Sequence, residues 1–337
     1  MQNLTLKDKL NKAGIKNFDV LIHDQQKKWL LENFEEGKKT YPVNVAALMR
    51  NIIWQIHSRI KNQEKEPLTE LIRTFWYMYI KPTLSRAGAL SNETDQYKQL
   101  IDNMVYMVKD LELLKYKDIG FRDDKESHRK VGGNSNIILF SEKAGHQNFL
   151  DEISKKYDVS ILALGGQPSV LNVEYFVDDL KVHNVNLRRS FYLFSIVDYD
   201  PSGWIIRDAF INDLIFYGVK NIKCYDLVNP DMLTIEELLL AKYLIPTPEE
   251  MKSKNEDWLL EVRSAEYQHQ AFLEETQKNK KILYGLEAES ISSKRLSKKL
   301  EEVMVPLLGK SEDLLKTFEL KKLNDSIKKL ILYKLTR

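Results

Sequence analysis

The fold of this chain is decided by the stretch FYLFSIVDYDPSG at residues 191–203. Its first seven residues form an apolar run of the length of a buried strand, and Asp198 and Asp200 follow directly. A similar apolar run at residues 136–140 is followed by Glu142. Acids thus stand at the ends of two predicted strands, which indicates a site at one edge of a sheet.

Glu142, Asp198 and Asp200 are predicted to bind Mg²⁺, with Mn²⁺ as a substitute. Hard cations take oxygen ligands from one or two carboxylates and complete their shells with water and phosphate oxygens. In an open α/β sheet, acids from different strands can converge outside the carboxyl ends of the strands. An isolated Asp-x-Asp is more often an ordinary solvated loop, so it is the third acid that favours a metal site.

Composition describes an ordinary globular chain of 337 residues, 43% hydrophobic and 30% charged, with room for two domains. No apolar run approaches the roughly 18 residues of a membrane span, and Met1–Asp8 lack the apolar core of a signal peptide. We therefore expect no membrane association and a cytoplasmic, nucleoid-associated protein. The single cysteine, Cys224, excludes an intrachain disulfide and a cysteine-rich metal site. A net charge of +2 leaves DNA binding to local clusters.

The N-terminal part is predicted to be helical. Residues 1–43 form a charged helical extension without a motif, and residues 44–61 follow as a helix with an apolar stripe at Val45, Leu48, Ile52, Ile56 and Ile60. A second helix carries Leu68, Leu71, Phe75 and Met78 on its apolar side and ends near Lys81, because Pro82 disfavours helical geometry in the residue before it. A third helix covers about residues 95–110.

Residues 113–133 are predicted as a β-like wing and linker, so residues 44–133 fit a winged-helix domain. Strands are then expected at 136–140, 159–164, 191–197 and 219–224, with helices at 146–157, 171–182 and 203–217. This alternation predicts a parallel sheet with crossover helices.

Residues 134–337 are predicted to be a metal-binding domain with a helical C-terminal part. Beyond Pro230 we expect mostly helix, interrupted at Pro246 and Pro248 before the segment 251–280. The closing basic stretch is interpreted as an amphipathic surface helix rather than a DNA-binding tail. It contains Lys294, Arg295, Lys298, Lys299, Lys321, Lys322, Lys328 and Lys329. The predicted fold class is therefore α/β plus mainly helical.

Tyr77 is a candidate nucleophile because Arg73 and Lys81 stand four residues to either side of it on one helical face. A phenol has a pKa near 10 in water, so attack on phosphorus needs nearby positive charge to favour the phenolate. Arg73 fits best as a phosphate ligand, since its planar fork forms paired hydrogen bonds. On this helix alone, an amphipathic surface tyrosine remains the commoner interpretation.

Three motifs carry a resemblance to a known family. Residues 73–77, RTFWY, resemble the Arg-x-x-aromatic-Tyr motif of the DNA-cleaving A subunit of type IIB topoisomerases (topoisomerase VI) and of its relative, the meiotic double-strand-break transesterase. Residues 138–143, ILFSEK, and 197–203, VDYDPSG, are similar to the motifs of the family's Toprim domain. A weaker similarity lies at residues 286–292, LEAESIS, so the ordered set covers roughly residues 44 to 305.

The chain departs from the family after its second Toprim strand. Gly166-Gln167-Pro168-Ser169 and Asn172-Val173 stand where the family often has Gly-x-Pro-Asp and Thr-Arg. The arginine and acid of that loop are therefore not carried over. The chain also has no Gly-x-x-x-x-Gly-Lys-Ser/Thr loop, and the family's GHKL-type ATPase is a separate B subunit, so full topoisomerase activity implies such a partner.

The resemblance implies that Tyr77 attacks a phosphodiester of double-stranded DNA and becomes joined to the 5′ end. Arg73 would orient the phosphate, and Glu142, Asp198 and Asp200 would hold Mg²⁺. In this family the tyrosine and the metal site come from different subunits, which implies a homodimer. A Toprim hydrolytic nuclease with a structural Tyr77 and a non-catalytic DNA-binding subunit remain as alternatives. Lys143 is interpreted as a solvated residue or a phosphate contact, and Gly203 as the residue that permits the turn into a helix.

Overall fold

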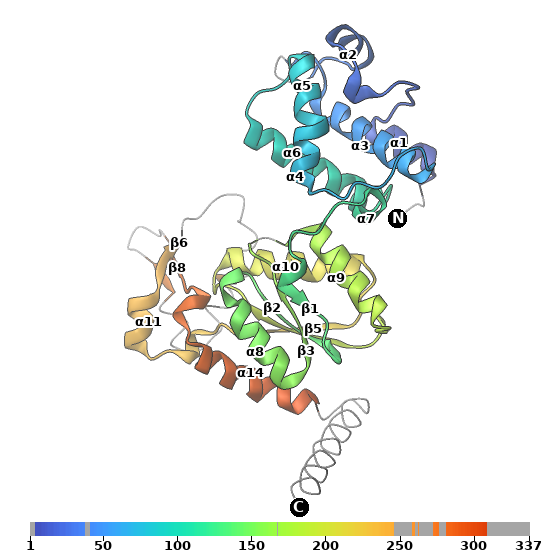
Figure 1. Cartoon of the computed structure of the whole chain (residues 1–337). Coiled ribbons are helices and arrows are strands. Elements are labelled where there is room, and N and C mark those ends of the chain that lie inside the picture. Colours follow the sequence, from blue (N-terminus) through green and yellow to red (C-terminus); the bar gives the residue numbers. More distant parts are fainter. Residues whose placement is uncertain are drawn as a thin grey trace, which may run out of the picture. The chain divides into compact units, whose positions relative to one another are not determined.

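The computed structural model describes residues 4–37, 41–166, 168–245, 258–259, 262, 272–275 and 281–308 (Figure 1). The chain divides into two compact units, Met1–Glu126 with Val170–Tyr175, and Ser127–Ser169 with Phe176–Arg337. The expected breaks at Pro246 and Pro248, most of the segment 251–280 and the basic residues Lys321, Lys322, Lys328 and Lys329 lie outside the described residues.

The first unit is built from helices. They are α1 (Leu6–Ala13), η1 (Ile22–Asp24), α2 (Lys27–Asn33), α3 (Val45–Lys61), α4 (Ile72–Phe75), the π-helical η3 (Trp76–Ile80), α5 (Lys81–Ala87), α6 (Glu93–Val105), the π-helical η4 (Tyr106–Asp110) and α7 (Tyr116–Ile119). The helices expected at 44–61 and 95–110 are confirmed as α3 and as α6 with η4. Residues 4–37, expected to be an extension, share a compact unit with these helices.

Helix α3 shows how the apolar pattern selects the buried face. The Asn44 side chain accepts a hydrogen bond from the backbone N–H of Ala47 and so caps the first turn. Leu48, Ile52 and Ile56 are buried at a helical spacing of four residues. The helix therefore begins at a polar cap and turns its stripe into the core.

The expectation that the second helix stops near Lys81 is wrong. Segments α4, η3 and α5 follow one another without a break from Ile72 to Ala87, and Pro82 lies in the first turn of α5. The backbone N–H of Lys81 bonds to the carbonyl of Trp76, five residues earlier, so the turn before the proline is widened. This widening accommodates a ring that clashes with an ordinary α-helical turn.

Two apolar residues assigned to the buried side of that helix are exposed, Leu71 at 39% and Met78 at 53%. Phe75 is buried as expected, and Trp76 and Tyr79 join it in the core. The π-helical turn rotates the following residues away from the register of a regular α-helix. Periodicity calculated for a regular helix therefore misplaces the apolar face after Phe75.

The β-like wing and linker expected at residues 113–133 do not begin with a strand, and the strand in this range, β1 (Arg129–Lys130), lies at its end. Leu113 and Leu114 are buried without forming a strand, and the short helix α7 follows. The carboxylate of Glu174 accepts hydrogen bonds from the backbone N–H groups of Tyr116 and Lys117, at 3.2 and 3.0 Å. A buried acid 57 residues or more away in sequence thus caps the helix, a contact that no local pattern announces.

The second unit contains a five-stranded sheet in the order β1-β3-β2-β4-β5. Its strands are β1 (Arg129–Lys130), β2 (Asn134–Ser141), β3 (Val159–Ala163), β4 (Phe191–Ile196) and β5 (Ile222–Asp226). Strands β2 to β5 are mutually parallel, and β1 runs antiparallel beside β3. The predicted α/β class with a parallel sheet is confirmed.

Crossover helices connect these strands: α8 (Gln147–Tyr157), α9 (Val170–Val182) and α10 (Pro201–Phe216). One face of the sheet buries Leu139 and Ile161 in a core shared with Leu150 of α8. On the other face, the rings of Phe140 and Phe210 of α10 lie 4.6 Å apart. The central strands are buried on both faces, which is why they read as unbroken apolar runs.

Beyond Pro230 helices make up most of the described residues, as expected, but the chain also forms a small sheet that the sequence did not predict. The chain forms α11 (Ile235–Ala241) and an antiparallel sheet of β6 (Tyr243–Ile245), β8 (Lys281–Gly285) and β7 (Leu273–Glu275) in the order β6-β8-β7. These strands are only three to five residues long, too short for an alternating pattern to mark them. Helix α14 (Ser293–Leu308) buries Leu296 and Leu300, which confirms an amphipathic helix at Lys294–Lys299.

Gly203 in the first turn of α10 is required for this packing. A Cβ atom there would lie 2.1 Å from the carbonyl oxygen of Asp198. Gly203→Ala is expected to lower the free energy of unfolding by about 1–3 kcal/mol through overpacking, although Ala ordinarily favours a helix. Urea denaturation would measure this, with Gly145→Ala as the control because its Cβ would meet only Glu289 Oε1, at 3.8 Å. Equal stability of the two variants would contradict the close approach.

Candidate functional site

The acids Glu142, Asp198 and Asp200 lie where the strand order of the sheet reverses. Strand β3 pairs with one side of β2 and β4 with the other, so the chain crosses over between them. Ligands of open α/β sheets bind in the crevice outside the carboxyl ends of the strands at such a switch point. Ser141 pairs with Ile196, and the N–H of Glu142 bonds to the Ile196 carbonyl at 3.0 Å, so the two strand ends are level.

The Glu142 carboxylate is half-buried, and its Oε2 atom has no hydrogen-bond partner among the residues that the structure describes. Burial raises the pKa of Glu142, and the negative charges of Asp198 and Asp200 raise it further, against the opposing effect of a hydrogen bond from the Asp198 backbone. A buried carboxylate oxygen without a donor is costly. The site therefore holds negative charge that is not fully compensated.

Asp198 is held by contacts on one of its oxygens. Its Oδ1 atom accepts a hydrogen bond from the N–H of Ala288 at 2.8 Å and lies 3.4 Å from the ammonium of Lys143. Lys143 Nζ also lies 3.0 Å from Glu289 and 3.9 Å from Glu287. Burial lowers the pKa of Lys143, but the bond to Glu289 and the nearby acids outweigh it, so the net shift is upward. Lys143 is thus the counter-ion of the acids rather than a solvated residue.

Both carboxylate oxygens of Asp200 are engaged in hydrogen bonds that hold the structure together. Asp200 is buried, and its Oδ1 accepts a hydrogen bond from the N–H of Gly203 at 2.6 Å, which caps α10. Its Oδ2 accepts the hydroxyl of Tyr243 at 2.6 Å. A Cβ on Gly285 would lie 2.7 Å from the Tyr243 ring, so this glycine makes room for the tyrosine. Burial and the bond to Asp200 raise the pKa of Tyr243, which keeps it a neutral donor.

The three acids fit a divalent cation unequally. Glu142 offers an unpartnered oxygen, and Asp198 lies beside it, whereas both oxygens of Asp200 already accept hydrogen bonds. Among the described residues, no group of three or more His, Cys, Asp or Glu side chains is arranged closely enough to hold a metal ion. Glu142 and Asp198 are therefore the pair whose chemistry suits a hard cation.

Tyr77 lies on the π-helical turn η3 and is 46% exposed. The guanidinium of Arg73 lies 5.8 Å from the centre of its ring and the ammonium of Lys81 5.2 Å from it. The structure therefore brings the three predicted residues together. Lys81 also forms an ion pair with Glu93 at 2.6 Å, so much of its charge is compensated.

Sequence reasoning missed the groups that complete the acidic site. In sequence, residues 286–292 carry only a weak family similarity. In the structure, Glu287 and Glu289 form ion pairs with Lys143, and the backbone N–H of Ala288 donates a hydrogen bond to Asp198. Glu-x-Glu in that stretch was the available signal. Tyr243 had no signal, because its partner is 43 residues away and β6 is only three residues long.

Cys224 lies on β5 and is suited to packing rather than to chemistry. Burial raises the pKa of its thiol to about 12, and the charge of Asp226 contributes. A thiol with such a pKa is not a nucleophile near neutral pH, since the thiolate is the reactive form.

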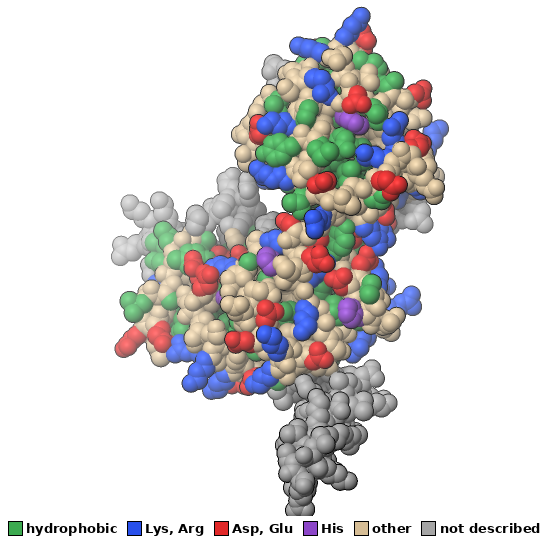
Figure 2. All heavy atoms as spheres, viewed as in Figure 1, with side chains coloured by type: hydrophobic (Ala, Val, Ile, Leu, Met, Phe, Trp, Pro, Cys, Tyr) green, Lys and Arg blue, Asp and Glu red, His purple; other side chains and the backbone are tan. Residues whose placement is uncertain are grey.

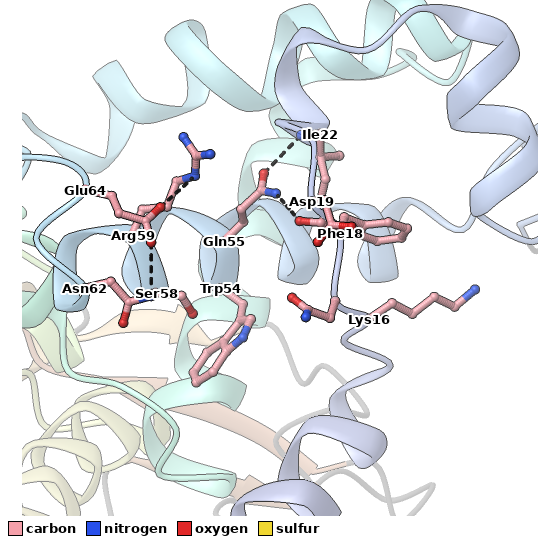
Figure 3. A pocket seen from close by; sticks show the side chains of 11 residues that line it. Lys16, Phe18, Asp19, Ile22, Trp54, Gln55, Ser58, Arg59, Asn62 and Glu64 are labelled. Carbon is pink, nitrogen blue, oxygen red and sulfur yellow. Dashed lines mark hydrogen bonds and ion pairs between the residues drawn. The ribbon is translucent and has the colours of Figure 1, made fainter.

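A hollow of about 270 Å³ lies in the first unit, between residues 16–19 and the C-terminal half of α3 (Figure 3). Gln55 crosses its wall and accepts a hydrogen bond from the N–H of Ile22 at 3.0 Å. Arg59 at the other end pairs with Glu64 at 3.8 Å. These side chains hold the loop to the helix, so the hollow does not present a convergent catalytic set among the residues drawn.

Charged side chains of both signs are interspersed on the face of the molecule shown in Figure 2. This agrees with the net charge of +2. On this face, contact with a polyanion would depend on individual groups and not on a broad basic surface. No helix within the described ranges is long and apolar enough to cross a membrane.

Comparison with known proteins gives no assignment. The sequence matches no family of known proteins, and no curated protein resembles it significantly.

The raised pKa of Glu142 predicts a pH-dependent gain from Glu142→Gln. Between the ordinary glutamate pKa and the raised value, the folded state binds more protons than the unfolded state, so stability falls as pH rises through that window. Glutamine does not ionise. The variant should therefore melt at a higher temperature than the wild type at about pH 8, and the gain should vanish near pH 4.

Thermal melts across this pH range would measure the effect, with Glu152→Gln as the control because Glu152 is exposed on α8. A wild type that is as stable as Glu142→Gln at every pH would contradict the charge accumulation at the site.

Proposed function

We propose that the protein is a DNA-cleaving subunit resembling the A subunit of topoisomerase VI, which makes double-strand breaks by tyrosine transesterification. The observation that carries the proposal is the pairing of Glu142 with Asp198 at the switch point of a parallel sheet, where one oxygen of Glu142 is buried and has no hydrogen-bond partner among the described residues. The order of the Tyr77 and acid motifs along the chain supports it.

On this proposal the helical unit corresponds to the family's winged-helix domain and the α/β unit to its Toprim domain. The helical unit would be a member without wing strands at residues 113–126, where α7 stands instead. The parallel order β3-β2-β4-β5 and the acids after β2 and β4 are the features that support a Toprim assignment.

Tyr77 would supply the nucleophile. Its phenolic oxygen forms a bond to the phosphorus of a phosphodiester, the bond from phosphorus to the 3′ oxygen breaks, and the proton lost by the phenol is balanced by one gained by the 3′ hydroxyl. The product is a 5′-phosphotyrosyl link, so one phosphodiester replaces another and cleavage itself needs no nucleotide. Arg73 would hold the phosphate through its N–H groups.

Glu142 and Asp198 would hold Mg²⁺, or Mn²⁺ in its place, and Asp200 would join them only by giving up a bond to Gly203 or Tyr243. The cation would neutralise the scissile phosphate and stabilise the departing 3′ oxygen. Lys143, already paired with Asp198, would balance the acids when the cation is absent.

The proposed assembly is a homodimer on double-stranded DNA, since two tyrosines are needed to cut both strands. A separate GHKL-type ATPase subunit would be required for strand passage. The proposed location is the nucleoid of the cytoplasm.

A hydrolytic nuclease that uses the same acids is the second candidate. The arrangement around Tyr77 favours it in one respect, because Arg73 and Lys81 lie over the ring and Lys81 is paired with Glu93. Cations over the ring face favour phenolate less than cations beside the hydroxyl oxygen would. Water would then be the nucleophile.

Tyr77→Phe is expected to abolish protein-linked breaks while it leaves the fold unchanged, because the side chain is exposed and loses only its hydroxyl. Purified protein would be incubated with supercoiled DNA and Mg²⁺ or Mn²⁺, quenched with detergent and analysed with and without protease. Breaks that stay on protein until protease treatment in the wild type, and vanish in Tyr77→Phe, would establish transesterification.

Tyr41→Phe is the matched control, because Tyr41 is a partly exposed tyrosine of the same unit whose hydroxyl forms a hydrogen bond with Ser91, at 2.7 Å. Free breaks that survive Tyr77→Phe and vanish in Asp198→Ala would replace the proposal by hydrolysis. Metal-independent DNA binding without cleavage would indicate a binding subunit.

A further inference from the structure

The guanidinium of Arg73 contacts a second aromatic ring besides Tyr77. It lies 5.3 Å from the ring centre of Tyr97 on α6 and 5.8 Å from that of Tyr77. Both distances fall within the range of cation–π attraction. The guanidinium of this α4 residue thus lies over two rings that come from two other segments of the helical unit, η3 and α6.

Cation–π contacts engage none of the five N–H donors of a guanidinium in a hydrogen bond, so these donors stay available to a ligand. Within the described residues, Arg73 forms cation–π contacts but no hydrogen bond or ion pair. Arg50 differs from Arg73 in this respect. It also lies over a tyrosine ring, that of Tyr106 at 5.8 Å, but its guanidinium donates hydrogen bonds to the Ala13 carbonyl and to the side chain of Asn103. Arg73 is therefore a positioned cation whose donors are uncommitted.

Tyr97 is the better anchored of the two rings. It is half-buried, and its ring meets that of Trp76 edge-on at 6.0 Å. Burial raises the pKa of its phenol, so it stays neutral. Tyr77 is more exposed and by itself would not fix the arginine.

We propose that Tyr97 is a positioning residue that holds Arg73 so that its N–H edge binds a phosphate oxyanion beside the Tyr77 hydroxyl. The identity of that anion as a DNA phosphodiester rests on the proposed function, whereas the anion site follows from the contacts of Arg73. If Arg73 only covered the Tyr97 ring, its loss would change stability and leave anion binding unchanged.

The first test measures binding of a short DNA duplex without divalent metal, by fluorescence anisotropy at several salt concentrations. Tyr97→Leu removes the ring and is expected to weaken binding about two- to fivefold, whereas Tyr97→Phe keeps the ring and should stay within about twofold of wild type. Arg73→Gln should weaken binding and lower the salt slope by about one phosphate contact. The double variant Tyr97→Leu/Arg73→Gln should bind like Arg73→Gln alone.

Tyr106→Leu is the matched control, because it removes the ring beneath an arginine whose donors are committed. It should leave binding unchanged. Urea denaturation of each variant separates lost binding from lost fold. The proposal is overturned if Tyr97→Phe weakens binding as much as Tyr97→Leu, or if the losses of Tyr97→Leu and Arg73→Gln add independently.

The second test uses inorganic phosphate as the probe and separates this proposal from the DNA proposal. Phosphate should raise the melting temperature of the wild type and, equally, of Tyr97→Phe and Tyr106→Leu. It should raise the melting temperature of Arg73→Gln and of Tyr97→Leu by a smaller amount. This pattern in a wild type that does not bind DNA would support the anion site and refute the proposed function. An equal rise in wild type and Arg73→Gln would overturn the anion site.

Discussion

The carboxylate of Asp200 is the interaction on which the candidate site depends. One oxygen caps α10 through Gly203, and the other accepts the hydroxyl of Tyr243 on β6. Because Tyr199 also exchanges backbone hydrogen bonds with Leu286, at 2.8 and 3.3 Å, the loop after β4 is fixed between the helix and the second sheet. Asp198 projects from a loop held on both sides, which is how a loop becomes a defined site.

Charge balance is the second constraint. Lys143 lies among Asp198, Glu287 and Glu289, while one buried oxygen of Glu142 has no hydrogen-bond partner within the described residues. Burying like charges together costs stability unless a cation or a proton compensates. The ammonium of Lys143 compensates part of the negative charge. Burial and the remaining charge raise the pKa of Glu142. The region is thus least stable in the ionisation state that binds a hard cation best.

In the helical unit, the geometry of one helix and a few contacts decide which cation is available to a ligand. The π-helical turn before Pro82 keeps the helix continuous and leaves Tyr77 exposed between Arg73 and Lys81. Lys81 is bound to Glu93, whereas Arg73 is held only by aromatic rings within the described residues. The two cations that look equivalent in sequence therefore differ in what they can offer a ligand.

The sequence by itself determined the strands and crossover helices from β2 to β5 and the acids at their ends. Apolar runs buried on both faces mark such strands, and a parallel order brings their carboxyl ends to one edge. Only the tertiary structure decided that α7 stands where a wing was expected, that Asp200 accepts the hydroxyl of Tyr243, and that Glu287 and Glu289 complete the site. Each of these depends on partners 43 residues or more apart or on short strands, so their contacts are set by packing and not by any local pattern.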